Sequence, residues 1–86
     1  MLCLQQMVAE LDLAEMLNIF EANDWKPNTD KVRKNKIPMV HADKQFPDNY
    51  VILHFPHPGS YYRQDQVRYL LSEAGISWQQ ALSALQ

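Results

Sequence analysis

The sequence predicts a small α+β domain in which helices pack on one face of an antiparallel sheet of two to three strands. Two observations lead to this prediction. A segment with apolar residues at three- and four-residue spacing precedes a run of β-branched and aromatic residues, and two helical segments with start and stop signals follow that run. With 86 residues, the chain has room for one hydrophobic core and one domain.

The first segment is predicted to be a helix. Its apolar face consists of Leu4, Met7, Val8, Leu11, Ala14 and Leu17. Asp12 and Glu15 have the spacing of a capping box, in which each side chain accepts a hydrogen bond from the other residue's backbone N–H. Leu11 and Met16 have the spacing of a hydrophobic staple around the same start. We therefore favour an interruption of the helix at this cap, with a second helical segment that begins at Leu13.

One continuous helix over about 3–22 is the alternative for this part of the chain. Either way, residues 1–11 are interpreted as an N-terminal extension, helical or the start of a longer first helix, and residues 12–86 as a single domain. Asn23 and Asp24 are expected to end the helix.

The segment after this helix is predicted mostly as loop. Trp25 is expected to fold back onto the core. Residues 26–38, bracketed by Pro27 and Pro38, are polar and basic with few apolar anchors, and they form at most one edge strand.

The run from Tyr50 to Phe55 is the strongest predicted strand, because it is rich in β-branched and aromatic residues. Alternation divides its side chains between two faces, with Tyr50, Ile52 and His54 on one and Val51, Leu53 and Phe55 on the other. A turn signal precedes the run, so residues about 38–46 are predicted to pair antiparallel with residues 50–55. In such a hairpin, His41 and His54 come within reach of each other across the strands.

Two helices are predicted at the C-terminal end. The first covers about 61–74, with a core face formed by Val67, Leu70, Leu71 and Ala74. Gly75 stands where a helix ends in a left-handed residue. Ser77 and Gln80 form a second capping box, which starts a short helix over Trp78 to Leu85.

Charge is distributed unevenly along the chain. The formal net charge of −2 argues against a protein that coats nucleic acid over its whole surface. Residues 25–47 nevertheless carry six bases against two acids, a local charge of +4. This segment is either a loop that faces phosphates or a solvated loop whose lysines avoid the core.

The single cysteine, Cys3, cannot form an internal disulfide, which fits a reducing compartment. No apolar run approaches the roughly 18 residues of a membrane span, and the first residues do not have the form of a signal peptide. We therefore expect a cytoplasmic protein that does not bind membranes.

His41, His54 and His57 are the side chains suited to proton transfer near neutral pH. Their spacing matches no zinc motif, and no cysteine accompanies them. We expect no metal and no cofactor.

The run VILHFPHPGSYYRQDQVRYLLSEAGISWQQALSAL (residues 51–85) resembles the C-terminal half of HicA-type, YcfA-like toxins. In that family a strand ends in a Pro-His-Pro-like exit, and a helix ends in an Ala-Gly-Ile-Ser-like turn. The stretch LAEMLNIFEANDW (residues 13–25) resembles the first helix of the family and the aromatic residue after it. The Gly-Ser-His signature of these toxins is absent here, and the link to the second strand is longer than usual.

The resemblance implies an α-β-β-β-α fold like that of double-stranded-RNA-binding domains, metal-independent cleavage of mRNA, and neutralisation by a HicB-type antitoxin. It implies His41 as the catalytic residue, acting as acid or base on the RNA 2′-hydroxyl. The residues expected to contact RNA phosphates are Lys31, Arg33, Lys34, Lys36, Lys44 and Arg63.

A second class of function stays open from the sequence. The chain is alternatively a non-catalytic interaction protein, such as a phage or plasmid inhibitor or adaptor that binds a larger protein partner. A homodimer is also compatible with a domain of this size.

Overall fold

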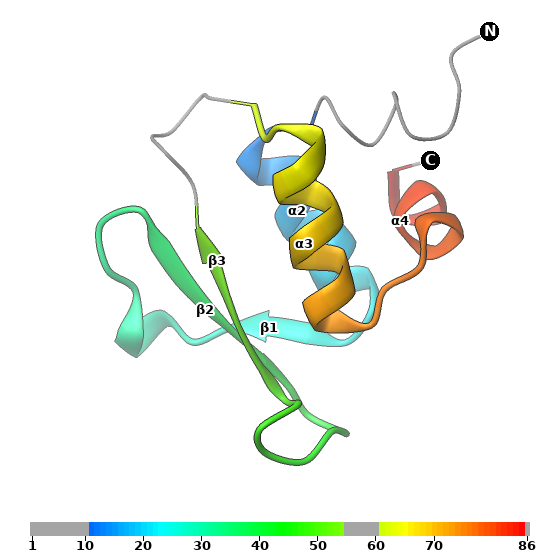
Figure 1. Ribbon diagram of the computed structural model, residues 1–86. Coiled ribbons are helices and arrows are strands. Elements are labelled where there is room, and N and C mark those ends of the chain that lie inside the picture. The colour runs from blue at the N-terminus through cyan, green and yellow to red at the C-terminus, as the bar shows by residue number, and fades with distance from the viewer. Residues whose placement is uncertain (1–10, 55–60, 86) are drawn as a thin grey trace, which may run out of the picture.

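The computed structural model describes residues 11–54 and 61–85, and it has the predicted α+β architecture (Figure 1). The elements in chain order are α2 (Leu13–Ala22), β1 (Trp25–Pro27), the 3-10 turn η1 (Thr29–Lys31), β2 (Lys36–His41), β3 (Tyr50–His54), α3 (Gln64–Ala74) and α4 (Trp78–Leu85). None of the helices in these two ranges is long and apolar enough to cross a membrane. The predictions for the N-terminal extension before residue 11, and for residues 55–60, lie outside the described residues.

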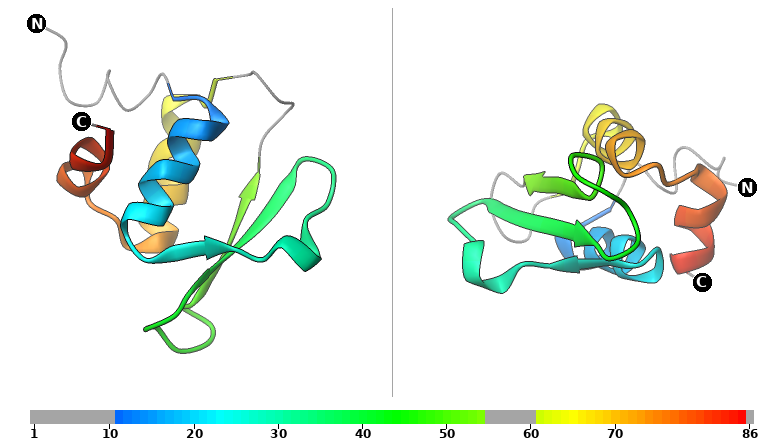
Figure 2. Two further views of the ribbon diagram at one scale, coloured as in Figure 1. Left: turned by 180° about the vertical axis from the view of Figure 1, so that it is seen from behind. Right: turned by 90° about the horizontal axis from the view of Figure 1, so that it is seen from below.

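The three strands form one antiparallel sheet in the order β1-β2-β3. Helix α2 packs near β1, α3 packs along β3, and α4 packs against α2. Figure 1 views the sheet nearly along its plane, and the helices all lie on one side of it; Figure 2 shows the same arrangement from behind and from below. In the described part of the chain, the opposite face of the sheet is not covered by a helix. The sheet therefore has a helix face and an open face.

The start of α2 confirms the predicted capping box. The Glu15 N–H donates to Asp12 Oδ1 at 2.9 Å, and the Asp12 N–H donates to Glu15 Oε1 at 3.2 Å. Leu11 and Met16 are both buried, as a hydrophobic staple requires. The helix thus begins at Leu13, which confirms the predicted break between Leu11 and the helix.

The hairpin of β2 and β3 begins two residues earlier than predicted, at Lys36, and Pro38 lies inside it opposite Ile52. Proline fits there because its backbone faces β1 and not β3. The Asn28 N–H donates to the Pro38 carbonyl oxygen at 2.8 Å, and Asn28 lies just beyond the end of β1. The missing proline N–H therefore removes one bond at the end of a short strand and none from the hairpin.

The segment predicted mostly as loop contains a strand, β1, and a tight turn over residues 33–36. Strand β1 has three residues, which is too short for an alternating pattern to stand out in the sequence. Backbone pairing with β2, from Trp25 opposite His41 to Pro27 opposite Met39, defines it instead.

The two C-terminal helices are confirmed, with a later start for the first. Helix α3 begins at Gln64 and not at residue 61, because Tyr61 forms an isolated bridge with Asp12 and the Tyr62 N–H donates to the Leu11 carbonyl at 2.7 Å. These contacts keep residues 61 and 62 extended. The helix ends at Gly75, whose φ of 70° is left-handed as predicted.

The start of α4 confirms the second predicted capping box. The Ser77 N–H donates to Gln80 Oε1 at 2.8 Å, and the Gln80 N–H donates to Ser77 Oγ at 3.1 Å.

The core lies between the helices and the helix face of the sheet. It consists of Leu11, Met16, Ile19, Phe20, Trp25, Met39, Val51, Leu53, Tyr62, Val67, Leu70, Leu71, Ala74, Ile76 and Ala81. All four residues predicted as the core face of α3 belong to it. Trp25 is only 1% exposed, and its ring meets the Phe20 ring edge-on at 5.8 Å. Burying one large apolar side chain contributes about 1.5–3 kcal/mol to the free energy of unfolding.

Tyr62 brings a polar atom into this core. Its side chain is 2% exposed, and its hydroxyl has no hydrogen-bond partner among the described residues. Burial raises the pKa of this hydroxyl well above the ordinary tyrosine value, because the charged phenolate loses its hydration.

We expect Tyr62→Phe to raise the free energy of unfolding by about 1 kcal/mol at pH 7, because the ring stays buried and a hydroxyl without a partner is removed. The raised pKa favours the protonated form in the folded state, so wild-type stability falls as the pH rises above about 10. Tyr62→Phe removes this part of the loss. Denaturant unfolding at pH 7 and at a pH above about 10 measures the two effects.

Tyr61→Phe is the matched control. Because Tyr61 is 66% exposed, removing its hydroxyl should change neither the free energy of unfolding at pH 7 nor its decrease at high pH. A Tyr62→Phe variant that is less stable at pH 7 would contradict the prediction and reveal a partner for the hydroxyl.

Candidate nucleic-acid interface

A tight turn brings most of the predicted phosphate-binding residues together. Arg33 and Lys36 exchange backbone hydrogen bonds of 3.0 and 3.1 Å, and Asn35 takes the left-handed conformation with a φ of 66°. Asparagine is among the residues that tolerate this conformation best. Turn η1 ends just before it, at Lys31. We call the group formed by Lys31, Arg33, Lys34 and Lys36 the basic turn.

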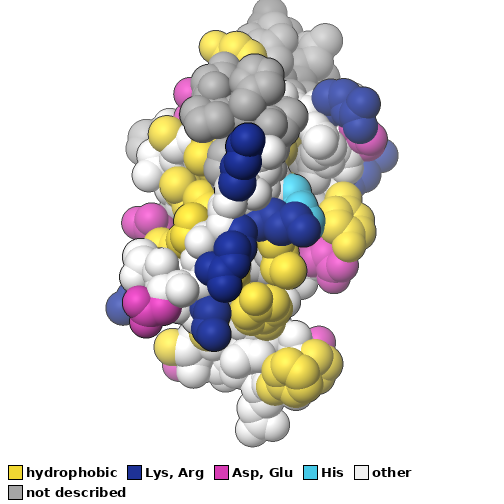
Figure 3. Space-filling view, turned by 90° about the vertical axis from the view of Figure 1, so that its left-hand side faces the viewer, with side chains coloured by type: hydrophobic (Ala, Val, Ile, Leu, Met, Phe, Trp, Pro, Cys, Tyr) yellow, Lys and Arg dark blue, Asp and Glu magenta, His cyan; other side chains and the backbone are white. Residues whose placement is uncertain are grey.

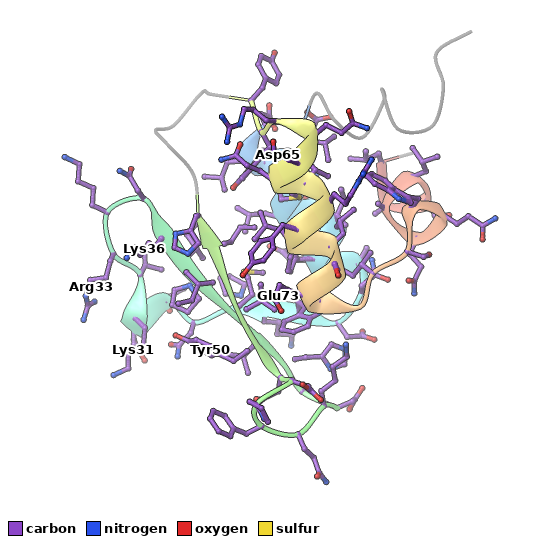
Figure 4. All side chains as sticks on the ribbon, viewed as in Figure 1. Lys31, Arg33, Lys36, Tyr50, Asp65 and Glu73 are labelled. Atoms are coloured by element: carbon purple, nitrogen blue, oxygen red, sulfur yellow. The ribbon has the colours of Figure 1, made fainter. Side chains whose placement is uncertain are left out.

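All four cations of the basic turn are exposed to solvent. The described residues contain one salt bridge, and it joins Arg63 to Asp65 elsewhere on the molecule. Within that part of the chain, none of these four cations forms a salt bridge, and Asp30 is the one acid among residues 29–36. Figure 3 looks onto this side of the protein and shows Lys and Arg side chains in a line down its centre, and Figure 4 shows Lys31, Arg33 and Lys36 projecting from the same end of the hairpin.

The open face of the sheet continues from the basic turn. Lys36 is opposite His54, and paired residues in adjacent strands point to the same face. Tyr50 and Ile52 alternate with buried residues of β3, so they share this face with His54, as predicted from the sequence. Tyr50 is 43% and Ile52 36% exposed. Lys36 thus lies beside an imidazole, and an apolar side chain and an aromatic ring follow along the same face, a combination typical of single-stranded nucleic-acid binding.

His41 lies at the other end of β2 and on the helix face. It is two residues from the buried Met39 and pairs with Trp25, whose ring it meets edge-on at 5.2 Å. Its Nδ1 accepts a hydrogen bond of 3.0 Å from the Asp43 N–H, which assigns the proton of the neutral ring to Nε2. Five residues of strand, about 16 Å, separate it from Lys36.

The predicted proximity of His41 and His54 is wrong. The register places His54 opposite Lys36, whereas His41 lies opposite Asn49 and its N–H donates to the Asn49 carbonyl oxygen at 3.0 Å. The two imidazoles therefore occupy opposite ends and opposite faces of the hairpin.

Lys44 belongs with His41 and not with the basic turn. Its ammonium group donates to the Ala74 carbonyl oxygen at 2.8 Å and lies 5.4 Å from the centre of the Trp25 ring. That carbonyl is at the C-terminus of α3, where a positive charge is favourable. Lys44, His41 and Trp25 line a small polar pocket of about 200 Å³, in which Lys44 holds α3 to the β2–β3 loop.

Arg63 also lies apart from the basic turn. It precedes the first residue of α3, and its Nε is 3.4 Å from the Asp65 carboxylate. Both side chains are about three-quarters exposed, so the pair contributes little to stability. The structure thus groups four of the six predicted phosphate-binding residues and separates Lys44 and Arg63 from them.

We expect Lys44→Met to lower the free energy of unfolding by about 1–2 kcal/mol, because the methionine loses a charge-assisted hydrogen bond at a helix end and the contact of the ammonium group with the Trp25 ring. Lys34→Met, at an exposed position in the basic turn, is the control and should change stability by less than about 0.5 kcal/mol. Thermal or denaturant unfolding of the three proteins measures this. Unchanged stability together with weaker RNA binding by Lys44→Met would place Lys44 in the RNA interface instead.

Sequence reasoning did not identify Tyr50, Ile52 and His54 as part of an interface. Alternation placed them on one face, but the strand register was needed to bring that face next to the basic turn.

Within the described residues, no group of three or more His, Cys, Asp or Glu side chains is arranged to hold a metal ion. No protein-family model, curated protein or solved structure matches this chain. The resemblance to HicA-type toxins therefore stays a prediction from the sequence.

Proposed function

We propose that this protein binds single-stranded RNA, with the phosphates on the basic turn and the bases on the open face of the sheet. The observation that carries the proposal is the clustering of four exposed cations that form no salt bridge with a described residue and have one acid, Asp30, among them, on a chain whose net charge is negative. Surface lysines spread for solubility alone would be mixed with acids. A concentrated positive patch instead creates the local field that attracts a phosphate backbone.

The open face supplies the second part of the interaction. Tyr50 offers an exposed aromatic ring on which a base can stack, and His54 lies directly across from Lys36. Stacking on an aromatic ring contributes about 1–3 kcal/mol per base and does not depend strongly on sequence. The face therefore favours unpaired nucleotides with little base specificity.

We expect binding of a fluorescent single-stranded oligouridylate to weaken as salt increases, with a slope of log K against log[salt] of about −2 to −3 for three to four phosphate contacts. Arg33→Gln should make this slope shallower by about 0.7, since it removes one contact. Arg68→Gln is the matched control: it makes the same charge change on the exposed side of α3 and should leave the slope unchanged. Fluorescence anisotropy at several salt concentrations measures both. Equal effects of the two variants would show that only net charge matters.

Cleavage of bound RNA is the further activity that the resemblance implies. It requires a group that accepts the 2′-hydroxyl proton within hydrogen-bond reach of the bound strand. His41, the residue that the resemblance implies, lies on the helix face at the far end of β2, whereas His54 lies on the open face opposite Lys36. The geometry thus favours His54 as the proton acceptor if the RNA lies on the basic turn.

A cleavage assay separates the two histidines. Incubating single-stranded RNA with wild type, His41→Gln and His54→Gln, we expect His54→Gln to remove the cleavage and His41→Gln to retain it. A 2′-deoxy substrate is the control, because it lacks the attacking hydroxyl. Loss of cleavage in His41→Gln alone, with its melting temperature unchanged, would favour the assignment from the resemblance. Intact RNA with every protein would leave RNA binding as the whole function.

A further inference from the structure

The two edges of the sheet differ in how they are protected. Strand β1 is only three residues long and ends in Pro27, which are features that discourage pairing with another chain. Strand β3 is five residues long and reads Tyr-Val-Ile-Leu-His, with no proline, no bulge and no lysine or acid. It is the last strand in the order β1-β2-β3. None of these features therefore prevents another strand from pairing with the β3 edge.

The hydrogen-bond pattern shows which groups this edge presents. The His41 N–H donates to the Asn49 carbonyl, so these two residues form a hydrogen-bonded pair. In an antiparallel ladder every second pair is hydrogen-bonded in this way. Val51 and Leu53 accordingly use their backbone groups toward β2. The N–H and C=O groups of Tyr50, Ile52 and His54 point away from β2. None of them has a backbone bond to a described residue outside the sheet.

A groove runs along this edge, between β3 and α3. It consists of two adjoining hollows of about 260 and 370 Å³ that share His54, Tyr69 and Leu70. Helix α3 runs antiparallel to β3 along it, because Glu73 lines the hollow beside Tyr50 and Asp65 lines the one beside His54. Figure 4 shows Asp65 and Glu73 near opposite ends of α3.

The side of the groove on α3 carries a defined pattern of side chains. Asp65, Tyr69 and Glu73 are spaced four residues apart and therefore share one stripe of the helix. Tyr69 is 61% exposed and its hydroxyl hydrogen-bonds to the Glu73 carboxylate. Asp65 is partly neutralised by Arg63, so Glu73 supplies the stronger negative charge. The groove is thus apolar in its middle and acidic at its ends.

This pattern argues against a second copy of the chain as the occupant. Two β3 edges paired about a two-fold axis would bring the two α3 helices together antiparallel. Asp65 of one copy would then lie near Glu73 of the other, and like charges would meet at both ends of the interface. A basic strand meets no such repulsion.

We infer that the β3 edge and the groove beside it bind an extended, basic segment of a protein partner, which adds to the sheet as a fourth strand. Backbone hydrogen bonds form with Tyr50, Ile52 and His54, and side chains of the added strand alternate between α3 and the open face. Asp65 and Glu73 are eight helical residues, about 12 Å, apart. That distance equals about four residues of strand, so the partner carries basic residues four positions apart with an apolar residue midway between them. The inference does not depend on RNA binding.

The test uses the whole protein and a nine-residue peptide with lysine at its third and seventh positions, valine at its fifth, and valine or threonine elsewhere. Amide hydrogen exchange is followed by NMR. In the free protein we expect fast exchange at Tyr50, Ile52 and His54 and slow exchange at Val51 and Leu53. Saturating peptide should slow exchange at the first three at least tenfold and leave the other two unchanged. Unchanged exchange at all three residues overturns the proposal.

Two matched peptides test the strand geometry. N-methylation of alternate residues on one edge of the peptide should weaken binding at least tenfold for each main-chain bond removed, whereas methylation of the other edge should not. Equal binding by both peptides overturns the proposal. Methylation alters the probe and not the protein, so a folding defect cannot imitate the result.

A charge exchange tests the chemistry of the occupant. Glu73→Lys should weaken binding of the lysine peptide by about tenfold and should strengthen binding of a peptide with glutamate at the same two positions. Glu21→Lys, an exposed change on α2, is the control and should alter neither affinity. If an RNA oligonucleotide protects the three edge amides and the peptide does not, the edge belongs to the RNA interface and the proposal fails. RNA binding that is weakened in Arg33→Gln, with peptide binding unchanged, separates the two sites.

Discussion

The burial of Trp25 is the constraint on which the rest of this structure depends. Its ring meets the Phe20 ring of α2, the His41 ring of β2 and the ammonium group of Lys44 at 5.8, 5.2 and 5.4 Å. Because Trp25 is also the first residue of β1, these contacts fix how the first helix leads into the sheet. They also hold the end of β2 and, through the bond from Lys44 to Ala74, the end of α3. One side chain thus joins four elements at one corner of the domain.

This corner determines which residues reach the open face. With Trp25 opposite His41, the odd-numbered residues of β2 turn toward the helices and the even-numbered ones away from them. A slip of one residue would bury Lys36 and expose Met39, a large apolar side chain that is now fully buried. The register that buries the core is therefore the same one that places Lys36 beside His54. Core packing and the candidate interface are two consequences of a single pairing.

Local features of the fold could be predicted from the sequence, because their causes lie within a few residues. The capping boxes at Asp12 and Ser77 and the left-handed Gly75 depend on contacts three to five residues apart, and all three are present. The alternation of β3 is equally local. An edge strand near residues 26–38 could only be left open from the sequence, because β1 is defined by backbone pairing with a segment more than ten residues away.

The grouping of the site residues depends on long-range contacts, and this is why the sequence predicted it only in part. Lys44 is separated from Ala74 by thirty positions, and nothing near it in the sequence indicates that its charge is used at a helix end. Residues in the basic turn, by contrast, lie close together along the chain, so their clustering follows from their spacing. The pairing of His54 with Lys36 needed the register of the hairpin, which begins at Lys36 and not near residue 38 as predicted.

The two proposed surfaces meet in β3. The side chains of Tyr50, Ile52 and His54 belong to the open face, while their backbone groups form the free edge. A strand added at that edge would extend the open face by one row of side chains, directly beside the residues proposed to contact RNA. If both ligands bind, each changes the affinity of the other by the same factor, since coupling between two sites is reciprocal. The basic side chains of the partner strand would point toward α3, and the alternate side chains would join the open face, where they either extend the surface for the bases or cover Tyr50. The sign of the coupling thus depends on which side chains the partner places beside that ring.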